Sequence, residues 1–331
     1  MKWTWLRHLG ATVGAAVLGT SAWAQSILPG PVVSTQWLAD HLDKVQVLEI
    51  RNDPKTFTSE PEIATTKDGK KVLEEFGGHI PGSRLLAAKE LRTERDIRGL
   101  KVKYMLPERA AFERVLQAAG VLADKPIVLV PEGQKISDFN DAARAYILLK
   151  SYADTPVAML DGGMVAWLLE GRPWSKEAPS NQAGNWAATA DRFARYVADS
   201  TDVAAAAERQ DVQLMDTRST SMYLGIFKRD YVYAYGHIPN ARNVPLETLF
   251  VTRGGVIRLL QPDTYRAVLQ AQGIDPAKPL ITYCNSGNDS SLPWFIASEI
   301  LGNPAARNFD GSLHQWTLEK RATVARVPAA M

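Results

Sequence analysis

The side chain in this sequence with the most varied chemistry is the thiol of Cys284, the only cysteine among 331 residues. A single cysteine cannot form a disulfide within its own chain, so it is either a buried, inert side chain or a reactive thiol. It follows the short apolar run Leu280–Tyr283 and opens the segment Cys-Asn-Ser-Gly-Asn-Asp-Ser, residues 284–290. A helix is expected from Ser291 to Leu301, with Pro293 in its first turn, where a missing N–H costs nothing.

This setting favours a reactive thiol. It places Cys284 at the carboxyl end of a strand and the amino end of a helix, the edge at which α/β sheets bind ligands. Backbone N–H groups of a loop containing Gly287 can converge on the sulfur, and the helix dipole adds partial positive charge. Both effects favour the thiolate over the thiol.

The elements that position this loop occur twice, because the sequence repeats itself. Four segments recur in the same order with small insertions between them. The aligned pairs are residues 45–51 with 212–218, 78–82 with 236–240, 116–130 with 269–283, and 161–167 with 310–316. Four collinear matches indicate a duplicated domain, and two copies make tandem domains and not a solenoid.

Each copy alternates predicted strands with predicted helices. Val45–Ile50 and Ile127–Val130 are too short for helices and are typical of strands buried on both faces. Ala110–Ala119 and Tyr265–Gln272 have apolar residues at helical spacing, and each leads through a glycine into the next strand. The sequence therefore predicts an α/β fold, with a mostly parallel sheet flanked by helices in each domain.

The two copies differ at the position of the thiol. Pro131 of the segment Pro131-Glu132-Gly133 stands where the second copy has Cys284. We therefore predict an inactive domain over residues 27–175 and a catalytic domain over residues 191–331. A linker over residues 176–190 is expected between them, since the segment at the end of the first copy has the composition of a linker.

The amino terminus has the pattern of a cleaved signal peptide. Lys2 and Arg7 form a basic region, an apolar run of small residues follows, and Ala22-Trp23-Ala24 matches a cleavage site. The apolar run falls short of the about 20 residues that cross a bilayer, so stable membrane insertion after cleavage is not expected. We predict that residues 1–24 are removed and that the protein is periplasmic or secreted.

Charge and motif content exclude several classes of protein. The 38 basic residues less Lys2 and Arg7 leave 36, equal to the 36 acidic residues, so the mature chain is formally neutral. A neutral chain without a basic tract lacks the electrostatic footprint of a nucleic-acid binder. The remaining histidines show no ligand spacing, and no phosphate loop or dinucleotide fingerprint is present. No metal and no cofactor are therefore predicted.

Taken together, these motifs resemble the rhodanese family of sulfurtransferases. The first copy repeats most of them, so the resemblance covers nearly the whole mature chain. The motifs in the second copy are Cys-x-x-Gly after a buried strand, Asp216-x-Arg218, Tyr223-x-Gly225, the turn Gly236–Pro239, and Asp310-Gly311 before Trp316.

The resemblance implies two tandem rhodanese-like domains, with an inactive first domain and an active second one. It implies that Cys284 alternates between thiolate and persulfide as it moves a sulfane sulfur from a donor, thiosulfate or 3-mercaptopyruvate, to cyanide or a thiol. A protein sulfur acceptor is a further alternative. Loop amides of residues 285–289 would hold the negative charge on sulfur, in the manner of an oxyanion hole.

The loop departs from the family pattern. Family members that act on thiosulfate place basic residues just after the cysteine, whereas this chain has the neutral Asn285 and Ser286 and the acidic Asp289. Mercaptopyruvate-type members carry a small residue and then Ser or Thr, which Ser286 matches. Tandem members also tend to have a donor-binding arginine where this chain has Met222.

Other residues are candidates for substrate binding or support. Three basic residues could supply the missing charge, Lys228, Arg229 and Arg253. Asp216 and Arg218 have counterparts in the domain without a thiol, which favours a structural ion pair. In mercaptopyruvate-type members the first-domain histidine of the His-Ile-Pro turn faces the active site, which makes His79 a candidate, with Asp68 as its partner. The whole loop from Cys284 is expected to line the site, namely Asn285, Ser286, Gly287, Asn288, Asp289 and Ser290.

Two other functions compete with sulfur transfer. Some phosphatases use a cysteine in the same kind of loop, but they need Cys-x5-Arg to clamp a phosphoryl group, and here Ser290 stands at the arginine position. A phosphatase is therefore disfavoured. A non-catalytic module that carries sulfur for a partner, or only binds a protein, is the main alternative, because the loop sequence and Met222 are unusual.

Overall fold

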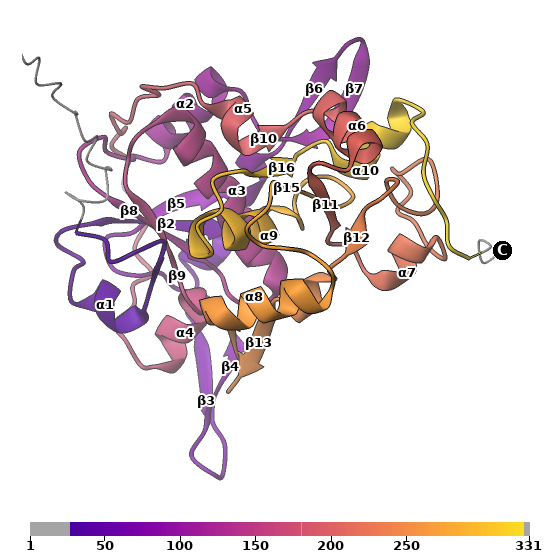
Figure 1. The fold of residues 1–331 in the computed structure, drawn as a ribbon. Helices are drawn as coiled ribbons and strands as arrows, with labels where there is room; N and C mark the ends of the chain where they lie inside the picture. Colours follow the sequence, from indigo (N-terminus) through magenta and orange to yellow (C-terminus); the bar gives the residue numbers. More distant parts are fainter. Residues whose placement is uncertain (1–26, 180, 328–331) are drawn as a thin grey trace, which may run out of the picture.

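Two parallel five-stranded sheets, one in each half of the chain, form the framework of the protein (Figure 1). A computed structural model describes residues 27–179 and 181–327, so the predicted signal peptide lies outside the described residues. The first sheet has the order β1 (Val32–Val33), β9 (Val157–Leu160), β8 (Ile127–Pro131), β2 (Gln46–Arg51) and β5 (Arg84–Ala87). The second has the order β10 (Val197–Ala198), β16 (Ala306–Phe309), β15 (Leu280–Tyr283), β11 (Gln213–Asp216) and β12 (Arg242–Asn243).

Equivalent strands occupy equivalent places in the two sheets, which confirms the α/β fold and the duplication. The central strands β2, β8 and β15 are buried along their whole length, as the apolar runs predict. In the first sheet Glu49 is the register partner of Val130, and in the second Asp216 is the partner of Tyr283. The residues after β8 and β15, at the carboxyl edge of each sheet, are therefore held by the same framework.

Helices cover both sheets. Those of the first half are α1 (Thr35–Ala39), α2 (Arg109–Ala118), α3 (Ile136–Tyr152) and α4 (Gly163–Leu169). Those of the second half are α5 (Phe193–Tyr196), α6 (Ser200–Arg209), α7 (Thr220–Leu224), α8 (Pro262–Ala271), α9 (Ser291–Phe295) and α10 (Ser312–Leu318). The predicted helix after the cysteine is present, but its second half, Ile296–Ile300, is a π-helix, because Leu301 N–H reaches back to Ile296 O at 2.9 Å.

The predicted helices of the repeat are confirmed as α2 and α8. Each ends at a glycine in the left-handed conformation, Gly120 with φ 78° and Gly273 with φ 76°. A side chain at that φ would be strained, so glycine here ends each helix and turns the chain into the next strand.

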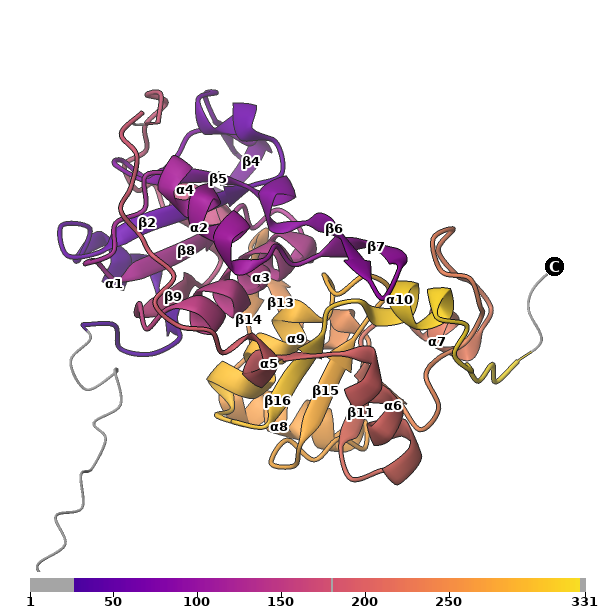
Figure 2. The same ribbon diagram turned by 90° about the horizontal axis from the view of Figure 1, so that it is seen from above.

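Three antiparallel hairpins project from the sheets. They are β3 (Glu62–Thr65) with β4 (Lys71–Glu75), β6 (Thr93–Ile97) with β7 (Leu100–Met105), and β13 (Phe250–Arg253) with β14 (Val256–Leu259). The β6–β7 hairpin belongs to the first domain but runs alongside α10 of the second (Figures 1 and 2). The β13–β14 hairpin belongs to the second domain and contacts the first.

The two hairpins exchange equivalent contacts. Leu106 N–H, just after β7, donates to Asp310 Oδ2 at 2.6 Å, and Leu259 N–H, at the end of β14, donates to Asp161 Oδ1 at 2.9 Å. Asp310 and Asp161 each begin the Asp-Gly turn of their domain. Each domain therefore holds the Asp-Gly turn of the other through a backbone N–H, and the interface has an approximate two-fold character.

A continuous apolar core joins the domains, because α3 of the first packs on α9 of the second. Tyr146 of α3 lies edge-on to Phe295 of α9, with ring centroids 4.8 Å apart. Beside this core, the buried Arg144 of α3 donates to Asp310 Oδ1 at 2.9 Å. Helix α3 of the first domain thus forms part of the helix layer that packs on the second domain.

The segment predicted as a linker packs against the first domain. Trp186 is buried, its indole N–H donates to Thr155 Oγ1 at 3.1 Å, and Gly184 N–H donates to Gln117 O at 2.7 Å. Within the two described stretches of the chain, no helix combines the length and apolar character that a membrane span needs.

The buried interdomain ion pair predicts a large stability effect. Arg144 and Asp310 are 0% and 1% exposed, so Arg144→Met leaves an uncompensated buried carboxylate. We expect the free energy of unfolding to fall by about 3–5 kcal/mol, measured by urea denaturation.

Arg258→Met is the control, since Arg258 of β14 contacts Asp161, the equivalent aspartate, at 3.3 Å and also pairs with Glu170, but its side chain and that of Asp161 are 28% and 25% exposed. This control is expected to lose about 1 kcal/mol or less. Equal losses in the two variants would contradict a special role for the buried pair.

Candidate active site

Cys284 directly follows β15 and is 1% exposed. The loop from Cys284 to Ser290 crosses the carboxyl edge of the second sheet and ends where α9 begins. Leu313 N–H donates to Cys284 O at 3.1 Å, and His314 N–H donates to Asn285 O at 2.8 Å. The start of α10 therefore fixes the backbone on both sides of the sulfur.

Ser312 holds the cysteine loop in shape. Its Oγ accepts hydrogen bonds from Cys284 N–H and Gly287 N–H, both at 3.0 Å, and donates to Phe309 O at 2.8 Å. The same oxygen lies 3.9 Å from Cys284 Sγ. The Gly287 N–H is thus bonded to the serine, so it is not one of the sulfur-facing amides that the sequence led us to expect.

The backbone of Ser312 is held in an unfavourable conformation. Its φ is 48°, in the left-handed region, where the first copy has Gly163 with φ 60°. A serine there costs of order 1 kcal/mol relative to a relaxed backbone. The second copy therefore has a strained backbone at the residue whose hydroxyl binds two N–H groups of the cysteine loop.

Burial dominates the electrostatics of the thiol. Burial, and then the Asp289 carboxylate, raise the pKa of Cys284 above its ordinary value, while Ser286 N–H and the hydroxyls of Ser290 and Ser312 act to lower it. The sequence favoured a thiolate, because loop donors can be read from a sequence and complete burial cannot. The structure supplies the donors, but burial outweighs their effect on the pKa of Cys284.

The first domain contributes side chains to this loop. Asn140 Nδ2, from α3, donates to Asp289 Oδ1 at 3.1 Å. The Asn288 amide donates from nitrogen to Asp141 Oδ1 at 3.0 Å and accepts at oxygen from Arg92 Nη2 at 3.2 Å. Arg92 itself pairs with Asp141 at 2.5 Å. The carboxyl end of the cysteine loop is therefore bound to α3 of the first domain.

Tyr231 reaches the loop from the other side. Burial, and then the charge on Cys284, raise the pKa of its phenol, while the Ser286 side chain acts to lower it. Its carbonyl accepts from His314 Nδ1 at 2.7 Å, while His314 Nε2 accepts from Lys103 N–H at 3.1 Å. His314 is thus a neutral imidazole that joins the β6–β7 hairpin to the Tyr231 segment.

Asn285 lies between the sulfur and α7. Its Nδ2 donates to Met222 Sδ at 3.4 Å, so the thioether stands where the family resemblance implies an arginine. Its Oδ1 is buried and has no hydrogen-bond partner within the described residues. The Met222 side of the cysteine loop therefore presents a neutral thioether and a neutral amide.

The silent loop of the first domain is filled by its own side chains. Glu132 Oε1 accepts from Asn52 N–H at 2.6 Å, and Asp138 Oδ2 accepts from Gln134 N–H at 3.0 Å. Burial raises the pKa of Asp138 to about 6. The polar side chains of this loop are thus paired with groups of the first domain itself.

Asp216 and Arg218 form a buried ion pair in the second domain. Arg218 Nη2 donates to Asp216 Oδ2 at 2.6 Å and to Gly236 O at 2.8 Å. In the first domain Arg51 pairs with Glu49 and donates to Gly78 O at 2.7 Å. The same geometry in both copies favours a structural role, in which the pair ties the first long strand to the His-Ile-Pro turn.

His79 and Asp68 make their contacts within the first domain. His79 is buried, its Nδ1 is 2.8 Å from Phe57 O, and its ring stacks on Phe57 at 3.8 Å. Asp68 lies in the turn between β3 and β4, where Thr66 Oγ1 donates to it at 2.5 Å. These contacts join neither residue to the cysteine loop or to each other.

The three basic candidates differ in their relation to the loop. Arg229 is exposed, but its charge lowers the pKa of Asp289, so it lies within electrostatic reach of the loop. Lys228 lies over the Tyr235 ring, 5.5 Å from its centroid. Arg253 is exposed at the end of β13, where it pairs in register with Val256. Of the three, only Arg229 has a recorded interaction with the cysteine loop.

Several residues at the site were missed by sequence reasoning. Ser312 had a readable signal, since it replaces a glycine of the first copy inside an aligned motif. Arg92, Asn140 and Asp141 had none, because they belong to the copy without a thiol and approach the loop only through domain packing. Among the described residues, no group of three His, Cys, Asp or Glu side chains is arranged as a metal site requires.

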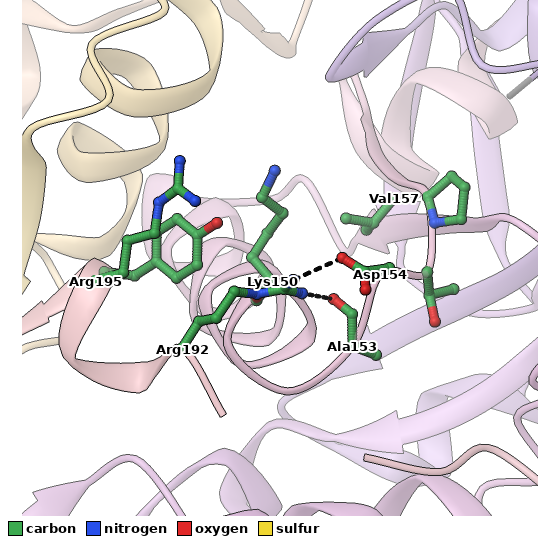
Figure 3. Close-up of a pocket in the computed structure, with 9 residues that line it drawn as sticks. Lys150, Ala153, Asp154, Val157, Arg192 and Arg195 are labelled. Atoms are coloured by element: carbon green, nitrogen blue, oxygen red, sulfur yellow. Dashed lines mark hydrogen bonds and ion pairs between the residues drawn. The ribbon is translucent and has the colours of Figure 1, made fainter. Parts of the chain in front are cut away.

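A separate crevice of about 200 Å³ lies at the other end of α3 (Figure 3). It is lined by Lys150, Arg192 and Arg195, among others. Its charged groups are largely paired within the protein, since Arg192 contacts Asp154 at 2.7 Å and Lys150 contacts Glu299 at 3.4 Å. None of its lining residues belongs to the cysteine loop.

Comparison with known proteins identifies both halves of the chain. The model of the rhodanese-like domain family matches residues 34–170 and 199–319. The chain is 28% identical over 310 residues to the sulfur carrier protein TtuD of Thermus thermophilus, covering 87% of this chain and 94% of that protein. It is 26% identical over 292 residues to the thiosulfate sulfurtransferase of Bos taurus, covering 88% and 93%.

A solved structure shows the same fold. The crystal structure of SseA from Escherichia coli, from a study of 3-mercaptopyruvate sulfotransferases, superimposes with a TM-score of 0.66 at 24% identity. The match covers 86% of this chain and 98% of that one.

The neutral His314 predicts a pH effect on stability. Burial lowers the pKa of His314, so the unfolded chain, with a pKa near 6.5, binds a proton that the folded chain does not. His314 therefore contributes stability that is full above about pH 6.5 and is lost as the pH falls below it.

His314→Asn keeps a donor for Tyr231 O but cannot titrate, so the free energy of unfolding should fall less between about pH 7.5 and 5.5 than in the wild type. Carboxylate contributions are common to both proteins and cancel in the difference. Parallel pH profiles would contradict the assignment.

Proposed function

Because the chain belongs to the rhodanese-like domain family, we propose that it is a sulfurtransferase that carries sulfur as a persulfide on Cys284. The sulfur comes from thiosulfate or 3-mercaptopyruvate and passes to cyanide or a thiol. One observation carries the proposal. The only cysteine of the chain ends a central strand of the second sheet, and Ser286 N–H and the Ser290 and Ser312 hydroxyls act on its sulfur.

The first half of the reaction loads the sulfur. The Cys284 thiolate attacks the outer sulfur of thiosulfate, a new S–S bond forms, and sulfite leaves with the electron pair of the bond that breaks. With 3-mercaptopyruvate the C–S bond breaks, and the pyruvate enolate leaves and takes a proton from water. In both cases the protein is left with a persulfide.

The second half returns the thiol. A nucleophilic acceptor attacks the terminal sulfur, the S–S bond to Cys284 breaks, and its electron pair stays on Sγ. Cyanide becomes thiocyanate and a thiol becomes a persulfide. This is a double displacement, in which the enzyme is covalently modified between two simple substitutions.

The loop donors have one task in both halves. Negative charge on Sγ or on the terminal sulfur develops in a buried site, where fixed donors are worth more than in water. Ser286 N–H acts on the sulfur directly, and the hydroxyls of Ser290 and Ser312, which donate to Asn308 Oδ1 and Phe309 O, can turn toward Sγ as its charge develops. They offset the cost of burying the anion that makes the resting thiol hard to ionise.

A second candidate function is sulfur carriage to a protein partner. It is supported by the likeness to the sulfur carrier protein TtuD over 87% of this chain. The carrier function uses the same persulfide and differs only in the acceptor. Phosphoryl transfer has no support, because Ser290 occupies the arginine position and its hydroxyl donates to Asn308 Oδ1 at 2.7 Å.

We further propose that the protein acts outside the cytoplasm, after removal of residues 1–24. The proposal rests on the basic, apolar and Ala22-Trp23-Ala24 pattern of the amino terminus. Expression of the full chain in a bacterium should give a periplasmic or secreted protein whose intact mass is that of a chain beginning at Gln25. A full-length chain in the cytoplasmic fraction would overturn it.

Persulfide formation is tested by intact mass. After incubation with thiosulfate, or separately with 3-mercaptopyruvate, the protein should gain the mass of one sulfur atom, and cyanide should remove it as thiocyanate. Cys284→Ala should neither gain sulfur nor form thiocyanate above the background rate. A folded wild-type protein that takes up no sulfur from either donor sinks the catalytic proposal, and an active alanine variant sinks the residue assignment.

A further inference from the structure

We propose that the sulfur acceptor of this site is a thiol that carries a positively charged ammonium group, and that Asp289 with α3 of the silent domain selects it. The inference rests on the proposed sulfurtransferase function and names its acceptor class. It is carried by the groups of the first domain that meet the cysteine loop.

The rim of the loop is where an acceptor must approach. Cys284 is 1% exposed, whereas Ser286, Asn288 and Asp289 are partly exposed. A persulfide extends the side chain by an S–S bond of about 2 Å, which moves the reacting sulfur away from the Cys284 backbone. Asp289 is the loop residue that contributes a charge to the surroundings of that sulfur, as its effect on the thiol shows.

The walls of this region offer oxygen atoms without partners. Within the described residues, Asn140 Oδ1, Asp141 Oδ2 and Asn285 Oδ1 are buried and accept no hydrogen bond. Asn140 is anchored to Asp289, and Asp141 to Asn288, so two of the three stand beside the cysteine loop. A buried acceptor without a donor costs about 1–3 kcal/mol, which a ligand with several N–H donors recovers.

The positive groups nearby are already engaged or exposed. Arg92 pairs with Asp141 at 2.5 Å and donates to Asn288, although its Nε is a buried donor without a partner within the described residues. Arg229 acts on Asp289 from an exposed position, where its charge is screened by water. Arg218, whose charge interacts with Cys284, also has a buried Nη1 without a partner within the described residues, but its charge is paired with Asp216. Three unpaired oxygens and the Asp289 carboxyl, against the unpaired N–H groups of Arg92 and Arg218, favour a cation over an anion.

Asp289 also makes the preference depend on pH. Burial raises its pKa above the ordinary value for a carboxyl group, so a bound ammonium group and the ionised carboxylate stabilise each other. The groups that interact with it are Arg229, Arg92, Asp141 and Asn140, together with Cys284 and Tyr231. The preference for a cation should therefore increase as the pH rises through the pKa of Asp289.

The transfer step balances without any other reagent. The acceptor thiolate attacks the terminal sulfur of the Cys284 persulfide, a new S–S bond forms, and the bond to Sγ breaks with its electron pair on Sγ. The products are the acceptor persulfide and the Cys284 thiolate. The ammonium group does not react and serves only to place the acceptor against Asp289.

The test compares three small thiols on the persulfide-loaded full chain. Cysteamine is cationic, 2-mercaptoethanol is neutral and 3-mercaptopropionate is anionic, and loss of sulfur from Cys284 is followed by intact mass. The ratio of the cysteamine rate to the mercaptopropionate rate should fall about tenfold in Asp289→Asn, the effect of removing one charge across a partly hydrated gap. The neutral thiol should change least.

Comparing variants cancels the intrinsic reactivity of the thiols. Asp263→Asn is the matched control, because Asp263 lies on α8 of the same domain with its side chain 98% exposed, and its rate ratio should equal that of the wild type. Asn at 289 can still accept from Asn140, so the loop should fold, which a thermal melt checks. An unchanged ratio in folded Asp289→Asn overturns the inference.

A second measurement is independent of sulfur transfer. Cys284 is the only cysteine, so its modification by 2-aminoethyl methanethiosulfonate and by 2-sulfonatoethyl methanethiosulfonate gives a clean mass shift. The cationic reagent should lose its advantage in Asp289→Asn, and equal ratios in the two proteins again overturn the inference. If no persulfide forms, the proposed function is wrong, but the charge preference of the site can still be measured with these two reagents.

Discussion

The buried ion pair between Arg144 and Asp310 is the constraint on which the rest of the site depends. Arg144 Nη1 and Leu106 N–H occupy the two oxygens of Asp310, and all three groups are out of contact with water. A Cβ on Gly287 would meet Asp310 O at 2.2 Å, so the cysteine loop is moulded on this turn. Ser312 follows two residues later and binds two loop amides. Through Leu106 and Arg144, the first domain thus fixes the Asp310 carboxylate on which the cysteine loop packs.

This arrangement explains what a domain without a thiol contributes. The reciprocal contacts of Leu106 with Asp310 and Leu259 with Asp161 show the same interface built twice. Only one of the two Asp-Gly turns is buried against an arginine of the facing helix, and only that turn carries a serine in the strained position. The two similar domains therefore differ at this turn, because the buried ion pair and the strained serine both occur at the turn of the second domain. The first domain closes the site from outside, while the second holds the sulfur.

The sequence predicted the framework well because strands, helix ends and repeats are local patterns. The fully buried runs became β2, β8 and β15, and the glycines after α2 and α8 took the left-handed conformation. The position of Cys284 after a central strand was equally readable. The contacts of Asn140, Asp141 and Arg92 were not, because they lie about 150 residues or more from the loop in sequence and depend on how two domains pack. The raised pKa of Cys284 was missed for the same reason, since complete burial is a tertiary property.

Burial and a neighbouring carboxyl both oppose the charge that sulfur chemistry requires, so the site must recover that charge when a substrate binds. Ser286 N–H and the hydroxyls of Ser290 and Ser312 supply part of the stabilisation of that charge, and they act on any substrate alike. Asp289 also acts on the charge at the site, and whether it attracts or repels a ligand depends on the charge of that ligand. An anionic molecule meets it as repulsion, whereas a cation removes the repulsion felt by the sulfur. In this chain, therefore, the residue that makes the resting thiol harder to ionise is also the one by which the site can distinguish its substrates.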